Sequence, residues 1–208
     1  MMYINSINTN GIFVIDPVSL KIGSYEILWF DYREIASTMD TAKEILKTNY
    51  KPWTVITTGK QTKGRGTHGR TWSSLPGKGL WMSVILPMPL NNDKLENLSF
   101  LAAESLIRCL NRFSDISFQI KNPNDVIVNG RKIAGILLES SSIDSVFNYI
   151  IMGLGLNITQ TARDFKNEGL HEATSLFIEG GRIPERKELI TVFLDYFISA
   201  YNHETAGT

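Results

Sequence analysis

The chain has 208 residues, 43% hydrophobic and 20% charged, and its 21 basic and 21 acidic residues cancel, which is typical of a soluble globular domain and argues against wholesale nucleic-acid binding. Its single cysteine, Cys109, excludes an internal disulfide and a thiolate metal cluster, and fits a reducing compartment. There is no long apolar span and no basic-then-apolar N-terminus, so we expect a cytoplasmic protein that does not bind a membrane.

The first half of the chain alternates short apolar runs with one helical segment. Residues 1–24 are expected to form an N-terminal extension of unclear role. Ser37, followed by an acid at Asp40, is an N-cap signature that predicts a helix from there to about residue 48. Strands are expected at residues 11–15, 25–30, 53–58 and 80–86.

The second half contains the clearest turn signal. Asn129-Gly130 stands between the apolar runs 126–128 and 131–139 and predicts a tight type I′ hairpin. Strands joined by hairpins, with helices between them, favour an α+β fold with a mixed, largely antiparallel sheet flanked by helices. The remaining predictions are helices at residues 95–112 and 185–201 and strands at residues 117–121 and 147–158.

The segment at residues 59–79, which we call the glycine loop, is the most unusual part of the sequence. It reads GKQTKGRGTHGRTWSSLPGKG, with six glycines, five basic residues and no carboxylate. Glycines let backbone N–H groups turn toward an anion, and arginine adds bidentate donors. No Asp or Glu occurs between residues 45 and 92, so we expect locally uncompensated positive charge and interpret the loop as a site for a small anion. A flexible basic surface loop is the alternative.

Two common nucleotide motifs can be rejected for this loop. Gly64-x-Gly66-x-x-Gly69 has the letters of a dinucleotide fingerprint, but a predicted strand follows it where the fingerprint needs a helix. A Walker A loop fails because no Gly-Lys-Ser or Gly-Lys-Thr follows at the required spacing.

Four motifs, taken in order, make the sequence resemble the catalytic domain of a biotin–protein ligase. They are GKQTKGRGTHGRTW before LWMSVIL, KNPNDVIVNGRKIAGILLES, GLGLNI and EATSL. The family's patterns are close to GRGRRGRxW, KWPNDxxxxxxKxxGIL and GxGxN, and the resemblance covers roughly residues 29–201. It implies an enzyme that uses ATP and Mg²⁺ to turn biotin into biotinyl-5′-AMP. The biotinyl group then passes to a lysine of a biotin carboxyl carrier domain.

The resemblance also implies roles for individual residues. Arg65 and Lys132 match the family's basic residues that screen the reacting carboxylate and phosphate, and Asp125 matches its acid beside the reacting carboxyl. Taken alone, Asp125 could equally be a turn acid, and Trp72 a core tryptophan. No residue is assigned to the metal. The resemblance implies biotin contacts at Ser37, Thr38, Gln61, Gly64, Arg65, Gly66, Lys132, Gly135 and Gly153, and ATP contacts at Arg70, Trp72, Lys121, Asn124 and Asn157.

Two positions depart from the family pattern. Thr67 stands where an Arg that helps to retain the adenylate is common, which predicts a leakier adenylate. Asn122 replaces the usual Trp of KWPND and leaves the identity of the acid open. Three alternatives therefore remain: a ligase for another carboxylic acid such as lipoate, a non-catalytic binder of biotin or nucleotide, and an interaction domain whose basic loop grips an acidic partner.

The expected domain organisation is simple. Residues 25–208 are predicted to form the catalytic domain, with no helix-turn-helix domain and no C-terminal β-barrel domain. DNA binding is therefore not expected, and a homodimer is left open.

Overall fold

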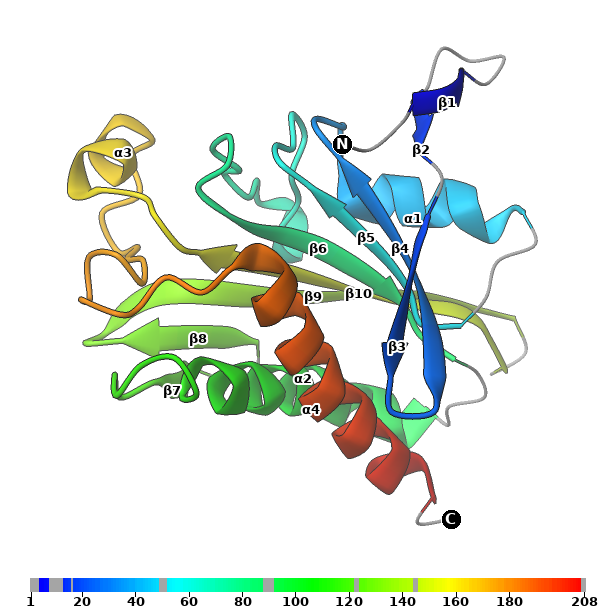
Figure 1. Ribbon diagram of the computed structural model, residues 1–208. Coiled ribbons are helices and arrows are strands. Elements are labelled where there is room, and N and C mark those ends of the chain that lie inside the picture. The colour runs from blue at the N-terminus through cyan, green and yellow to red at the C-terminus, as the bar shows by residue number, and fades with distance from the viewer. Residues whose placement is uncertain are drawn as a thin grey trace.

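The computed structural model describes residues 4–7, 13–15, 17–48, 52–87, 92–121, 124–143 and 146–206. An eight-stranded sheet forms the centre of this part of the chain (Figure 1). Its strands are, in spatial order, β3 (Val18–Ile22), β4 (Tyr25–Tyr32), β5 (Thr54–Thr58), β6 (Gly79–Ile85), β10 (Val146–Asn157), β9 (Arg131–Ile143), β8 (Asp125–Val128) and β7 (Gln119–Lys121). Every neighbouring pair is antiparallel except β4 and β5, which confirms the mixed, largely antiparallel sheet.

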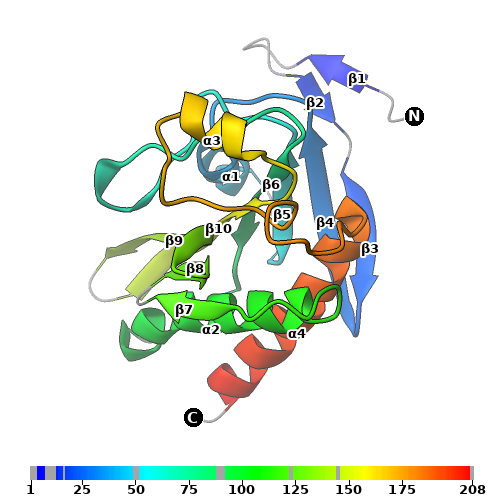
Figure 2. The same ribbon diagram turned by 90° about the vertical axis from the view of Figure 1, so that its left-hand side faces the viewer.

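Helices cover both faces of this sheet. Figure 2 shows α2 (Asn92–Leu110) and α4 (Arg186–Ala206) below the sheet, and α1 (Thr38–Leu46) and α3 (Ala162–Asn167) above it. Residues that alternate along a strand face opposite sides. On β5, accordingly, Val55 packs into the large core with α2 and α4, and Ile56 packs into a smaller core with α1.

Local signals explain where α1 and the central hairpin lie. Ser37 is the N-cap of α1, and its Oγ accepts a hydrogen bond from the Met39 N–H at 3.3 Å. Between β8 and β9, Asn129 and Gly130 have φ values of 50° and 76°, the left-handed pair that a type I′ turn requires. Both predictions are confirmed, and each places a functional segment: α1 lies beside the glycine loop, and the hairpin begins β9 next to Lys132.

The N-terminal residues contribute two small pieces of structure. β1 (Ile4–Ile7) and β2 (Phe13–Ile15) form a separate antiparallel pair. β3 then pairs with β4, and the Ile22 side chain is buried in the large core. The last residues of the predicted extension thus form the edge strand of the main sheet.

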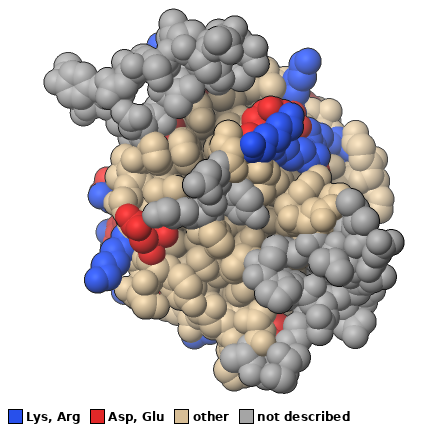
Figure 3. Space-filling model, turned by 90° about the vertical axis from the view of Figure 1, so that its right-hand side faces the viewer, with Lys and Arg blue, Asp and Glu red and all other residues tan. Residues whose placement is uncertain are grey.

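Two general properties of the described residues bear on function. None of their helices is both long and apolar enough to cross a membrane. Figure 3 views the face at the right of Figure 1, where the charged side chains stand in separate groups that include both signs.

Asn122, whose departure from the family pattern was noted above, lies outside the described residues.

Candidate active site

Two adjoining cavities lie beneath the glycine loop, on the sheet face that carries α1. We name them the Gln61 cavity and the His171 cavity, after a lining residue of each. The Gln61 cavity has a volume of about 40 Å³, and the His171 cavity has about 570 Å³. Both are lined by Gly66, Thr67, Trp72 and Lys132, so these residues form the wall between them.

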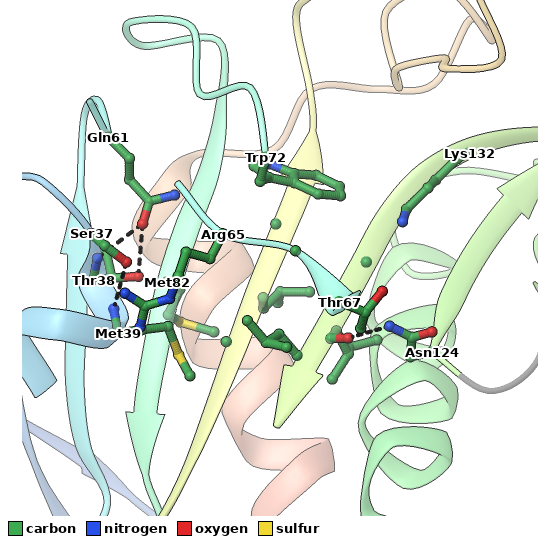
Figure 4. Close-up of a pocket in the computed structure, with 17 residues that line it drawn as sticks. Ser37, Thr38, Met39, Gln61, Arg65, Thr67, Trp72, Met82, Asn124 and Lys132 are labelled. Carbon is green, nitrogen blue, oxygen red and sulfur yellow. Dashed lines mark hydrogen bonds between the residues drawn. The ribbon is translucent and has the colours of Figure 1, made fainter. Parts of the chain in front are cut away.

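Hydroxyl and amide groups gather at one end of the Gln61 cavity (Figure 4). Gln61 Oε1 accepts hydrogen bonds from the Thr38 N–H at 2.9 Å and from Thr38 Oγ1 at 3.1 Å. Ser37 and Thr38 are buried, and they begin α1 at its positive end. The three predicted biotin-contacting residues at this end therefore form one connected group.

Two serines that sequence reasoning missed hold this group in place. Ser83 Oγ, on β6, donates to Thr38 Oγ1 at 2.7 Å, and Gln61 Nε2 donates to Ser74 Oγ at 2.9 Å. Both serines are buried. Neither has a distinctive sequence signal, because Ser83 lies in an apolar strand and Ser74 in a loop rich in small residues.

The floor of the Gln61 cavity consists partly of glycines on β9 and β10. A Cβ at Gly153 would lie 2.9 Å from Met39 Sδ, and one at Gly155 would lie 2.4 Å from Trp72 Cε2. A Cβ at Gly135 would also meet Trp72, at 2.9 Å from Cζ3. These glycines therefore let Met39 and the Trp72 ring lie directly on the backbone of the sheet.

Trp72 stands between the polar group and Lys132 in Figure 4. Its ring packs edge-on against Trp81, with centroids 6.3 Å apart, and Lys132 Nζ lies 5.1 Å from its centroid. Its Nε1 is buried and has no hydrogen-bond partner among the described residues. The indole is thus packed, as a tryptophan in a loop requires, while it still lines both cavities.

Arg65 does not stand free at the cavity rim. It forms ion pairs with Asp40 of α1 and with Glu139 of β9, the latter at 3.0 Å, and Glu139 also pairs with Lys43 at 2.6 Å. Partial burial lowers the pKa of Arg65, but the hydrogen bond from Arg65 to Asp40 and the charge of Glu139 outweigh it, so the net pKa shift is upward.

The glycine loop is therefore not uncompensated, which corrects the sequence prediction. Carboxylates distant in sequence reach it: besides the partners of Arg65, Lys60 pairs with Glu34 at 3.1 Å and Lys78 with Asp164 at 2.6 Å. A count of acids within residues 45–92 misses these carboxylates, because the fold brings them in from α1, α3, β9 and the chain before α1.

Lys132 occupies the wall shared by the two cavities. Its Nζ lies 2.6 Å from Asp125 Oδ1, where β8 begins, and the two side chains are 31% and 23% exposed. Asp125 thus has a side-chain partner on β9, outside its own turn. The pair places a cation in the wall shared by the two cavities and a carboxylate on its His171-cavity side.

The His171 cavity collects most of the predicted nucleotide contacts. Arg70, Lys121 and Asn157 line it together with Trp72. His171 and Glu172, which sequence reasoning missed, are exposed residues of the segment after α3 and line it too. Its volume lies within the range of about 300–1,000 Å³ that is usual for small-molecule sites.

Three of the residues predicted to contact a ligand make close contacts within the protein itself. Asn124 lines the Gln61 cavity and donates from Nδ2 to the Ile136 carbonyl at 2.6 Å. Asn157 is 5% exposed, donates to the Thr174 carbonyl at 3.0 Å and accepts from Gln160. Gly64 is buried inside the loop, where a Cβ would lie 2.4 Å from the Trp72 carbonyl oxygen. All the other predicted residues line one or both cavities.

Comparison with known sequences identifies the family of the chain. Residues 32–157 match the biotin/lipoate A/B protein ligase family. A Bacillus spizizenii protein named bifunctional ligase/repressor BirA is 36% identical over 167 residues, 80% of this chain and 51% of that protein. The biotin–acetyl-CoA-carboxylase ligase of Mycobacterium tuberculosis is 30% identical over 144 residues, 67% of this chain and 51% of that protein. This chain thus spans about half the length of both relatives.

Solved structures show the same fold. The biotin protein ligase of Aquifex aeolicus in complex with biotin and ATP has a TM-score of 0.69 and 27% identity, covering 88% of this chain and 72% of that one. The Leishmania major biotin protein ligase in complex with biotin has a TM-score of 0.66 and 26% identity, covering 82% and 73%. Since the family match covers more than half of the chain and the fold agrees, the chain belongs to the biotin/lipoate A/B protein ligase family.

Proposed function

We propose that the protein activates biotin with ATP to biotinyl-5′-AMP and transfers the biotinyl group to a lysine of a biotin carboxyl carrier domain. The observation that carries this proposal is the position of Lys132, in the wall between a small cavity with a polar end and a larger one of nucleotide size. An acid in the first and a nucleotide in the second would place carboxylate and α-phosphate on either side of its ammonium.

The first step joins two anions. A biotin carboxylate oxygen attacks the α-phosphorus of ATP, a P–O bond forms to it, and the bond to pyrophosphate breaks. Repulsion between the reactants and the charge on the departing pyrophosphate must be screened, and fixed cations do this best in a site from which water is excluded. We assign the screening to Lys132 and Arg65, which line the Gln61 cavity from two different elements.

The second step needs a base. The carrier lysine attacks the carbonyl carbon of the mixed anhydride, AMP leaves, and the amine loses a proton. Asp125 is the carboxylate closest to Lys132, at 2.6 Å, so it becomes available when Lys132 turns toward the phosphate. We propose that Asp125 orients the incoming amine and accepts its proton.

The polar end of the Gln61 cavity favours biotin over lipoate. A ureido ring offers N–H donors and a carbonyl acceptor, whereas a dithiolane has neither. Buried Ser37 and Thr38, with Gln61, would leave polar groups unpaired around a dithiolane, and such mismatches discriminate strongly. Against this stand the two sequence departures, at Thr67 and Asn122.

A magnesium ion would have few protein ligands here. Among the described residues no three His, Cys, Asp or Glu side chains gather at one point. Asp125 and Glu172 are the carboxylates among the residues that line the His171 cavity. This fits Mg²⁺, which commonly takes one or two carboxylates with phosphate oxygens and water as its remaining ligands. When bound, it would supply charge neutralisation at the phosphates.

In this conformation the Gln61 cavity is too small for biotin. A buried water needs about 10–15 Å³, so 40 Å³ holds about three waters. Binding therefore requires part of the wall to move, and the glycine loop that carries Arg65 is the part built mainly from exposed or half-exposed residues.

The proposal is tested by mass spectrometry of the purified protein incubated with Mg²⁺, ATP and either biotin or lipoate. We expect biotinyl-AMP and pyrophosphate with biotin. Lipoyl-AMP would transfer the assignment to the sister activity, and binding of either acid with no adenylate would identify a non-catalytic binder.

Thr67 yields a prediction about retention of the intermediate. It lines both cavities, and its Oγ1 accepts a hydrogen bond from Arg70 Nη2 at 2.8 Å. Because threonine is neutral, it offers no positive charge to the adenylate phosphate. Thr67→Arg is expected to slow the release of biotinyl-AMP by about 10- to 150-fold, since a charge-assisted hydrogen bond contributes about 1.5–3 kcal/mol. Release into a filtrate after single turnover measures it, and equal release from both proteins would contradict the assignment.

A further inference from the structure

The segment after α3 holds the backbone of Lys132 on both sides. The Lys132 N–H donates to the Glu172 carbonyl at 2.8 Å, and the Thr174 N–H donates to the Lys132 carbonyl at 2.8 Å. A parallel bridge thus forms between Lys132 and Ala173. Asn157 Nδ2 in turn donates to the Thr174 carbonyl at 3.0 Å, which ties the segment to β10.

A single carboxylate further along this segment joins it to the β8–β9 turn. The Glu179 side chain is 6% exposed. Its Oε1 accepts hydrogen bonds from Arg131 Nη2 at 2.7 Å and from Thr174 Oγ1, and its Oε2 accepts from Asn129 Nδ2 at 2.9 Å. Asn129 and Arg131 lie in the turn and at the start of β9, and Thr174 lies beside Lys132, so Glu179 links both sides of that lysine.

We propose that Glu179 is a positioning residue for Lys132, acting through the turn and through Thr174. The proposal rests on the function proposed above, in which Lys132 contacts the reacting groups. Glu179 belongs to none of the four sequence motifs that resemble the biotin–protein ligase family.

The physical reason is the flexibility of a lysine side chain. Four rotatable bonds separate Nζ from the backbone, so its position depends on a fixed backbone and on its contacts with Asp125 and Trp72. β8 ends at this turn and only the short β7 lies beyond it, so the sheet gives the turn little lateral support. A buried carboxylate with three donors supplies it, because charge-assisted hydrogen bonds are strong and directional.

Glu179→Gln preserves the shape of the side chain and removes its charge. Asp31→Asn is the matched control: Asp31 is also a partly buried carboxylate that accepts from an arginine, Arg186, at 2.8 Å and from a threonine, Thr57, at 2.7 Å. It lies on β4, four strands away from β9 in the sheet order. Both variants are expected to lower the melting temperature, and only Glu179→Gln is expected to disturb Lys132.

The first readout does not depend on catalysis. Pulse acetylation with acetic anhydride, followed by mass spectrometry, measures the reactivity of Lys132 relative to the exposed Lys187 of α4. We expect Lys132 to react several-fold faster in Glu179→Gln, because a looser turn weakens its shielding by Asp125 and Trp72. An unchanged Lys132, or the same increase in Asp31→Asn, would overturn the proposal.

The second readout is the rate of adenylate formation. A misplacement of about 1 Å can cost about 100-fold, so Glu179→Gln is expected to lower kcat by about 10- to 100-fold with little change in the KM for biotin. A fall in kcat no larger than that of Asp31→Asn would overturn the proposal. If wild-type protein forms no adenylate, the proposed function fails, and the acetylation result still decides whether Glu179 positions Lys132.

A second variant covers the case in which Glu179→Gln does not fold. Arg131→Gln removes one donor from a side chain that is 43% exposed. We expect a smaller change of the same sign in both readouts, and its absence in a folded Arg131→Gln protein would count against the proposal.

Discussion

Replacing Lys132 by alanine is expected to slow adenylate formation by about 100- to 1,000-fold, the loss that follows removal of one preorganised charge-stabilising group. Lys132 is the one charged side chain among the described residues that line both cavities. Arg65 lines only the Gln61 cavity and would have to move to replace it. Pyrophosphate release with biotin and ATP measures the rate.

The fold should survive this change. The Lys132–Asp125 pair is partly exposed, and pairs of this kind contribute about 0–1 kcal/mol, so the free energy of unfolding is expected to fall by about that amount. Lys60→Ala is the control. Lys60 is a lysine of the glycine loop that is 37% exposed, pairs with Glu34 and lines neither cavity. Near-normal turnover in Lys132→Ala, or an equal loss in Lys60→Ala, would remove Lys132 from the mechanism.

Adding one methyl group at Gly155 is expected to weaken ATP binding by about 5- to 150-fold, since stacking of a base on an aromatic ring contributes about 1–3 kcal/mol. The new Cβ would lie 2.4 Å from Trp72 Cε2 and 2.6 Å from Cζ2, so the rigid indole must leave its place on β10. Calorimetric titration with a non-hydrolysable ATP analogue measures the change.

Gly153→Ala, two residues earlier on the same face of β10, separates this effect from general damage to the strand. Its Cβ would meet Met39 Sδ at 2.9 Å, and a methionine side chain can adapt. We expect weaker biotin binding with ATP affinity unchanged. Equal losses of ATP affinity in the two variants would mean that Trp72 does not contact the nucleotide.

The elements that sequence reasoning found are those with strong local signals. The cap at Ser37 and the Asn129-Gly130 turn determine their own geometry, so α1 and the central hairpin were predicted close to their observed bounds. α3 was missed because six residues show no helical period, although the capping box between Thr161 and Asp164 was visible in the sequence. β3 was missed because its residues mix exposed and buried positions.

The candidate site shows a similar division. The motifs named residues that, apart from Gly64, line the two cavities. They could not reveal that Arg65 is held by Asp40 and Glu139, since Glu139 lies 74 residues further along the chain and meets Arg65 only in the folded sheet. The serines behind Gln61 and Thr38 are equally invisible, because their importance depends on which hydroxyl each one faces.

The wall that the two cavities share has a thermodynamic consequence. A ligand that enters the small Gln61 cavity by moving the glycine loop at Arg65 would also shift the neighbouring Gly66 and Thr67, which are surfaces of the His171 cavity too. In the proposed function, the two binding equilibria would therefore be linked. By reciprocity, whatever factor a bound acid applies to the dissociation constant of the nucleotide, the bound nucleotide applies to that of the acid.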